Sequence, residues 1–189
     1  TQAPYQFTIN QLSSGVARFY AKAVSGSMSA TSNIVTVEVG SQQPFNNVIR
    51  TIPGIIEAGH YDFFEGSIGQ GISYFDVSLA NQAGTFRSPE SVDAGIHTTE
   101  GATVGWVEAG EWLEYTVQVL QAGTYNMSFR YASGVSTGGP FTISVNGVIV
   151  SNGRTVAGTG GWNNWRTEIL EGIVLQAGVQ IIRVSFVNG

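Results

Sequence analysis

The sequence has no cysteine, few charged residues and no long apolar run. The lack of cysteine excludes a disulfide framework and thiolate metal sites. Only 11% of the 189 residues are charged, the net charge is -5, and Lys and Arg form no cluster. Binding to nucleic acid or to an anionic membrane needs a basic surface, so we expect neither partner. No stretch of 18 apolar residues is present, so we expect no membrane insertion.

Glycine and aromatic residues are abundant instead. Glycine accounts for 25 residues and aromatics for 11% of the chain, a profile typical of all-β proteins with many turns. No signal-peptide pattern begins at Thr1, so we interpret the chain as an excised or processed segment. The low charge and the many Asn, Thr, Ser and Gly residues favour a bacterial protein that is secreted or held at the cell surface.

Several segments alternate apolar and polar residues with the period of two that predicts strands with one buried face. They are EWLEYTVQV (111–119), TYNMSFRYA (124–132) and QIIRVSFV (180–187). Asn146-Gly147 lies between two apolar runs and predicts a two-residue hairpin, because both turn positions need positive φ. Two LQAG segments, at 120–123 and 175–178, predict tight turns before strands. The expected fold class is all-β.

The chain divides near residue 40. Residues 1–40 hold three strand signals, YQFTI, ARFYAKAV and IVTVEV, and residues 41–47 form a short polar linker with a proline. Three strands cannot enclose a core of their own. The first segment is therefore either truncated or packed on something else, and residues 48–189 form the main domain.

Two tryptophans, Trp162 and Trp165, lie three residues apart in the glycine-rich segment GTGGWNNWRTE. Positions i and i+3 of a strand face opposite sides, so at most one ring points into a one-sided core. Trp162 directly follows two glycines, and we expect it to be the exposed one. An exposed indole is most often used to recognise a flat apolar face.

A second group lies in VGWVEAGEWLEYTV, residues 104–117. Trp106 precedes a predicted turn at Ala109-Gly110 and is either a core residue or a loop residue able to face Trp162. Glu108, Glu111 and Glu114 are compatible with the paired carboxylates of glycoside hydrolysis. Their place beside an alternating strand favours a structural role, and no catalytic motif surrounds either histidine. We therefore predict no catalysis.

Metal ligands are the least defined feature. Glu57, Asp62 and Asp76 lie in glycine-rich surroundings. Oxygen ligands in loops suit calcium, but they also suit ordinary turn caps, and their spacing favours turns.

Four motifs in the same order closely resemble the family 6 carbohydrate-binding modules, which are attached to bacterial polysaccharide-degrading enzymes. They are VIRTIPGIIEAGHYDFFEGS, YFDVSLANQAGTFR, VGWVEAGEWLEYTVQVLQAGTYNMSFRYAS and GTGGWNNWRT with LQAGVQIIRVSF. The resemblance covers about residues 48–189. It implies a jelly-roll β-sandwich without catalytic activity, and any glycoside hydrolase or lyase domain would lie outside this chain.

The resemblance also implies a sugar site in the loops at one end of the sandwich. There two aromatic rings, Trp106 and Trp162, sandwich a terminal pyranose, while Trp165 turns back into the sheet. Asp93, with Glu90 as a second candidate, occupies the place of an acidic residue that binds a sugar hydroxyl. The expected ligands are polysaccharides such as xylan, β-glucan or agarose.

The chain departs from the family pattern in two places. The family often carries a second acidic residue where this chain has Gly59, so the structural calcium implied at Glu57 lacks one ligand, and Asp76 matches a second calcium position of some members. The chain also stops at Asn188-Gly189, before the family's last strand.

The first 39 residues resemble the end of a bacterial immunoglobulin-like domain without its leading strands. Either a larger protein was clipped inside this domain, or another polypeptide supplies the missing strands at exposed edges. The alternative function is a structural or adhesive cell-surface module.

Overall fold

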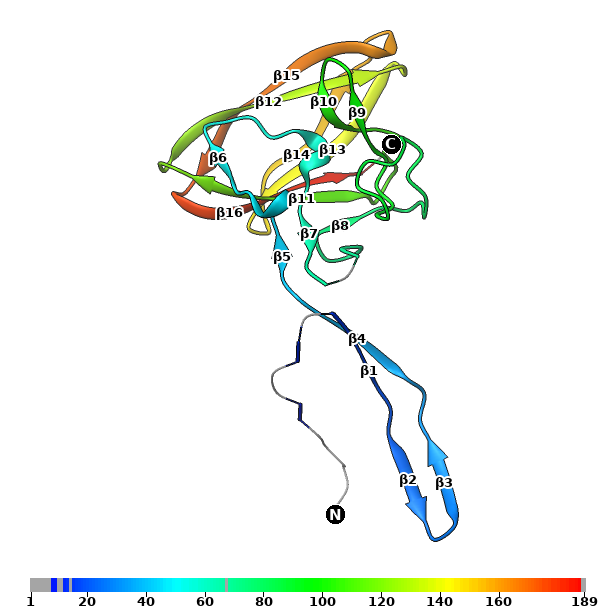
Figure 1. Cartoon of the computed structure of the whole chain (residues 1–189). Coiled ribbons are helices and arrows are strands. Elements are labelled where there is room, and N and C mark those ends of the chain that lie inside the picture. Colours follow the sequence, from blue (N-terminus) through cyan, green and yellow to red (C-terminus); the bar gives the residue numbers. More distant parts are fainter. Residues whose placement is uncertain (1–7, 10–11, 14, 67, 188–189) are drawn as a thin grey trace.

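The computed structural model describes residues 8–9, 12–13, 15–66 and 68–187, and within these ranges almost all regular structure is β-strand (Figure 1). The two helical elements are single 3-10 turns, η1 (Phe45–Asn47) and η2 (Ala58–His60). In the described ranges no helix has the length and apolarity needed to span a membrane. The all-β fold class predicted from the alternating segments is confirmed.

One layer of the main domain is a six-stranded sheet. Its order is β14 (Val148–Ala157), β13 (Thr137–Val145), β16 (Gly178–Phe186), β11 (Trp112–Val119) and β6 (Arg50–Ile52), with β8 (Tyr74–Phe75) also paired to β11. The β6–β11 pairing is parallel and the other pairings are antiparallel. The predicted strands at 111–119 and 180–187 are thus neighbours at the centre of the sheet, with Glu114 opposite Arg183.

The second layer is the antiparallel pair β12 (Gly123–Ser133) and β15 (Gly161–Leu175). Side chains from both layers meet in one core. Its buried members include Leu113, Tyr115, Val117, Val119, Phe141, Ile143, Val145 and Ile182 from the first layer and Leu170, Ile173 and Leu175 from the second. Each such side chain contributes about 1.5–3 kcal/mol when it leaves water. This burial confirms that the alternating pattern marks the two inner faces of a β-sandwich.

The predicted turns form as expected. Asn146 and Gly147 have φ values of 49° and 79°, and Val145 pairs with Val148 across them. The Asn146 Oδ1 also accepts the Ile181 N–H at 2.9 Å. The two LQAG segments connect β11 to β12 and β15 to β16.

The segment predicted as a polar linker, residues 41–47, pairs with the main domain. Gln42 and Gln43 form β5 (Gln42–Gln43), which pairs with β7 (Phe63–Phe64). Phe45 stacks on His60, with 4.3 Å between the ring centroids. The polar composition of this segment concealed the pairing, because its partner strand lies about twenty positions further along the chain.

The N-terminal part is an arm of paired strands that extends away from the sandwich (Figure 1). Strands β1 (Gly15–Phe19) and β4 (Val35–Val39) pair, and β2 (Lys22–Ser25) pairs with β3 (Met28–Thr31). The register puts Ala17 opposite Val37 and Phe19 opposite Val35, so one face of the arm is apolar. The predicted strand YQFTI lies mostly outside the described residues. The immunoglobulin-like assignment stays a prediction.

Candidate functional site

Trp106 lies on the loop after β10 (Gly101–Val104), and its side chain is 60% exposed. Its φ of 45° is a left-handed conformation, which costs a non-glycine residue roughly 1–2 kcal/mol. The Gly105 N–H donates to the Asp93 carbonyl at 2.9 Å and so fixes the start of the loop. Strained backbone that presents an open apolar ring is typical of a binding position.

Trp162 is the second residue of β15 and is 67% exposed, whereas Trp165 is half-buried. The ring of Trp165 meets the His97 ring edge-on, with 5.3 Å between centroids. Trp162 is therefore the exposed member of the pair, as the two preceding glycines predicted.

Two contacts tie the hairpin before Trp106 to the strand pair that carries Trp162. The hairpin consists of β9 (Ala94–His97) and β10, and it lies beside β12 and β15 (Figure 1). Glu100, in its turn, accepts hydrogen bonds from Arg130 Nε and Nη2 at 2.9 and 3.0 Å. The His97–Trp165 contact is the second tie. The elements that present the two exposed rings are thus connected to each other.

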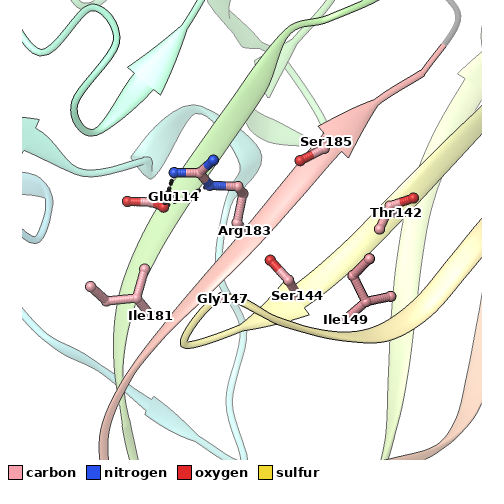
Figure 2. A pocket seen from close by; sticks show the side chains of 8 residues that line it. All are labelled: Glu114, Thr142, Ser144, Gly147, Ile149, Ile181, Arg183 and Ser185. Carbon is pink, nitrogen blue, oxygen red and sulfur yellow. Dashed lines mark hydrogen bonds and ion pairs between the residues drawn. The ribbon is translucent and has the colours of Figure 1, made fainter.

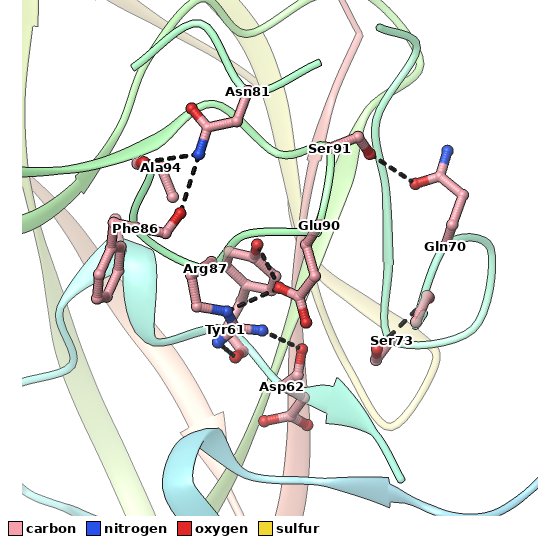
Figure 3. Close-up of polar contacts among 12 residues, drawn as sticks. Tyr61, Asp62, Gln70, Ser73, Asn81, Phe86, Arg87, Glu90, Ser91 and Ala94 are labelled. Carbon is pink, nitrogen blue, oxygen red and sulfur yellow. Dashed lines mark hydrogen bonds and ion pairs between the residues drawn. The ribbon is translucent and has the colours of Figure 1, made fainter. Parts of the chain in front are cut away.

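Glu90, a predicted sugar ligand, takes part in a protein network (Figure 3). Its Oε2 accepts the Tyr61 hydroxyl and the Arg87 Nε–H, both at 2.7 Å. The Arg87 guanidinium also donates to the carbonyls of Tyr61 and Asp62 and lies 3.7 Å from the centroid of the Tyr61 ring. Burial raises the pKa of Tyr61 far above its usual range, so the hydroxyl stays a donor. The network holds the loop of Glu90 to the segment before β7.

Asp93, the other predicted ligand, is only 2% exposed. One of its carboxylate oxygens accepts the Gln82 backbone N–H and the other accepts Gln82 Nε2. In this arrangement the carboxylate secures the loop that contains Gln82. The sugar-binding role of Asp93 and Glu90 stays a prediction.

Glu57 and Asp76, the predicted calcium ligands, each bond mainly to nearby backbone. Glu57 Oε2 accepts the Ala102 N–H at 2.6 Å, and Asp76 Oδ1 accepts the Ser78 N–H and hydroxyl at 2.8 Å. No group of three or more His, Asp or Glu side chains in the described ranges is arranged to hold a metal. A calcium ion would have to take most of its oxygen ligands from carbonyls or water, so the side chains present fit such an ion poorly.

The glutamates considered for hydrolysis have structural partners. Glu111 is buried and accepts the Val77 and Glu108 N–H groups, at 3.2 and 2.8 Å. Burial raises its pKa. Glu114 forms an ion pair with Arg183, 2.6 Å from Oε1 to Nη2. Neither carboxylate is presented with a partner acid across an open cleft, as glycoside hydrolysis requires.

A groove of about 320 Å³ crosses the outer face of the six-stranded sheet (Figure 2). It is lined by Glu114, Thr142, Ser144, Gly147, Ile149, Ile181, Arg183 and Ser185. The Arg183 guanidinium covers the Trp112 ring at 3.7 Å from its centroid. The groove therefore offers hydroxyl groups but no open aromatic ring. The alternating pattern did not reveal it, because outward polar residues of a strand look like an ordinary solvated face.

Comparison with known proteins identifies the kind of module. The sequence profile of the family described as "Carbohydrate binding module (family 6)" matches residues 82–189. An exo-beta-D-glucosaminidase of Amycolatopsis orientalis is 43% identical over 75 residues, 40% of this chain and 7% of that protein. The beta-agarase AgaO of Microbulbifer thermotolerans is 31% identical over 110 residues, 56% of this chain and 9% of that protein. The chain thus spans less than a tenth of the length of these relatives.

Among solved structures, a family 6 carbohydrate-binding module from Clostridium cellulolyticum in complex with xylose is similar. It is 25% identical, with 52% of this chain and 76% of that chain covered and a TM-score of 0.44.

Proposed function

This chain belongs to the family 6 carbohydrate-binding modules, which are non-catalytic, and we propose that it grips a sugar ring between Trp106 and Trp162. The observation that carries the proposal is the exposure of these two rings, 60% and 67%, on elements that Glu100–Arg130 and His97–Trp165 tie together. A pyranose presents C–H groups on its faces, which pack on an indole face. Its hydroxyl rim needs hydrogen-bond partners, for which Asp93 and Glu90 remain the proposed candidates.

The affinity expected from such a site is modest. If stacking and hydrogen bonding leave a net roughly 5–7 kcal/mol after association costs, the Kd is about 10 μM to 0.2 mM. A weak site suits a module that exchanges along a polymer and gains from several simultaneous contacts. We propose xylan, β-glucan or an agarose-like polymer as ligand, on a secreted or cell-surface protein whose catalytic domain lies outside this chain.

A second function, as a structural or adhesive module, is favoured by the N-terminal arm. Tyr20, Val24 and Met28 on the arm are 64%, 67% and 72% exposed. We propose that an immunoglobulin-like sandwich is completed there by strands from another polypeptide. Reproducible self-association of the chain, with no retention on any glycan, is the result that would favour this function over sugar binding.

The test is retention on insoluble xylan, on mixed-linkage β-glucan and on agarose. Trp106→Ala and Trp162→Ala should each reduce retention at least tenfold while the melting temperature stays close to that of the parent chain. Tyr20→Ala is the matched control, because it removes an aromatic ring of similar exposure from the arm. Normal retention by both tryptophan variants would refute the proposed site.

The melting temperature of the parent chain also tests for calcium. A structural ion that binds only the folded state raises the melting temperature with its concentration. Equal melting temperatures in chelator and in added calcium would contradict the calcium that the family resemblance implies at Glu57 and Asp76.

A further inference from the structure

We infer that Gly134 is a positioning residue for sugar binding, because the Trp162 ring packs directly against it. Gly134 follows the last residue of β12. A Cβ atom placed on it would lie 2.6 Å from both Cε2 and Nε1 of Trp162 and 3.0 Å from Cζ2. Real Cβ atoms do not approach other atoms this closely, so any larger residue must displace the indole. This inference rests on the proposed role of Trp162.

Backbone conformation does not explain the glycine. Its φ lies outside the left-handed range, and the position is exposed. An alanine would therefore meet no backbone strain there. The close approach of the Trp162 ring is the constraint that remains.

The backbone beneath the ring is held from two sides. Ser133 pairs with Gly161 across β12 and β15. The Ser133 N–H donates to Thr159 Oγ1 at 2.9 Å, and the Thr159 N–H donates to the Ser133 carbonyl at 2.9 Å. Both Ser133 and Thr159 are buried. The residue before Gly134 and the strand that carries Trp162 therefore cannot easily move apart to accommodate a side chain.

Gly134 thus lies directly against the indole of Trp162, which is nevertheless 67% exposed. An exposed tryptophan side chain ordinarily samples several rotamers, and ordering it on binding costs free energy. Close backing by the backbone limits this freedom before the sugar arrives. The glycine positions the ring without touching the ligand.

The experiment is a double-mutant cycle, with retention on xylan, β-glucan and agarose as the readout. Gly134→Ala should weaken retention about tenfold. In the Trp162→Phe background the same substitution should change retention less than twofold, because Phe lacks the indole atoms that the methyl group meets. The Trp162 indole N–H resonance, assigned by its loss in Trp162→Phe, should shift in Gly134→Ala. Gly123→Ala, at the start of β12, is the matched control, because the nearest atom to its Cβ would be 3.9 Å away and its φ is not left-handed.

The outcomes separate the two proposals. If Trp162→Ala weakens retention but Gly134→Ala does not, the role of Gly134 is wrong and the sugar site stands. Equal losses from Gly134→Ala in the parent and Trp162→Phe backgrounds, or an unmoved indole resonance, also overturn the inference. Normal retention by Trp162→Ala overturns the role of Trp162 and this inference with it, and a parent chain that binds none of the three polymers overturns the proposed site as well.

Discussion

Trp106 combines an exposed ring with a strained backbone, so mutations can change the ring contacts and the backbone strain separately. A residue with φ of 45° is disfavoured unless it is glycine. The side chain is 60% exposed and therefore contributes little burial to offset this cost. The strain is tolerated because this conformation presents the ring. A glycine at position 106 should therefore be more stable than an alanine there, while it removes the ring and lowers sugar binding.

We predict that Trp106→Gly is more stable than Trp106→Ala by about 1 kcal/mol, since glycine adopts the left-handed conformation without a Cβ clash. Both variants should lose glycan retention equally. Urea unfolding monitored by circular dichroism measures the difference. At Trp162, which lies in β15 and is absent from the positive-φ residues, the order should reverse, with glycine less stable than alanine by about 0.5–1 kcal/mol. The same order at both positions would contradict this explanation.

At the scale of elements, the β13–β14 hairpin shows how a two-residue turn stabilises a sheet. Gly147 has φ of 79°, and a Cβ on it would meet nothing within 4 Å. Any cost of a side chain there is therefore conformational and not steric. The turn also bonds to β16, where the Asn146 N–H donates to the Ile181 carbonyl at 2.8 Å.

Gly147→Ala should consequently lower the free energy of unfolding by about 1–2 kcal/mol, the cost of a left-handed conformation in an L-residue. Gly123→Ala, in β12, is the control, because its φ is not left-handed and its nearest contact would be 3.9 Å away. Its expected effect is neutral or slightly stabilising. Denaturant unfolding of both variants checks the prediction, and comparable losses would show that the turn conformation is not the cause.

Elements with strong local signals could be predicted, and elements that depend on distant partners could not. Strands β11, β12 and β16 alternate residue by residue, and Asn146-Gly147 is a local turn signal, so their places follow from the sequence. Strand β5 exists because β7 offers it an edge, and its own residues, Gln42 and Gln43, carry no strand pattern. The N-terminal arm likewise includes β3, which no sequence pattern indicated.

The same distinction holds for the site. The exposure of Trp162 could be predicted from the neighbouring glycines and from the i, i+3 relation, whereas the residue pattern left Trp106 as either a core residue or a loop residue. The burial of Asp93 could not, because it depends on Gln82 reaching back from another part of the loop. The packing of the Trp162 ring against Gly134 could not be predicted either, because it depends on the register of β12 on β15.

At the scale of the whole molecule, buried carboxylates set the response of stability to pH. Burial raises the pKa of Asp62 and Asp76 above 3.8 and that of Glu111 above 4.5, their ordinary values. Each of these groups binds a proton more readily in the folded than in the unfolded chain. Their protonation therefore stabilises the fold, and this contribution is complete below the unfolded pKa and is lost as pH rises through the folded pKa.

The exposed ion pair of Glu100 works in the opposite direction. Hydrogen bonds from Arg130 lower the Glu100 pKa below 4.5. The contribution of this pair is present above that value and is lost only as the pH falls through the lowered pKa. Above the ordinary pKa of a carboxylate, the buried carboxylates should therefore dominate the pH dependence of stability. The net charge of -5 also becomes less negative as the pH falls, which reduces repulsion between like charges.

We therefore predict that the melting temperature rises as the pH is lowered from 7 towards the raised pKa values of these buried carboxylates. Asp76→Asn keeps an oxygen to accept the Ser78 N–H and hydroxyl but removes one buried charge. Its melting temperature should depend less on pH over the same interval. Glu65→Gln, which removes an exposed charge, controls for net charge alone. Scanning calorimetry at constant ionic strength makes the comparison, and a similar reduction in both variants would assign the effect to overall repulsion instead of burial.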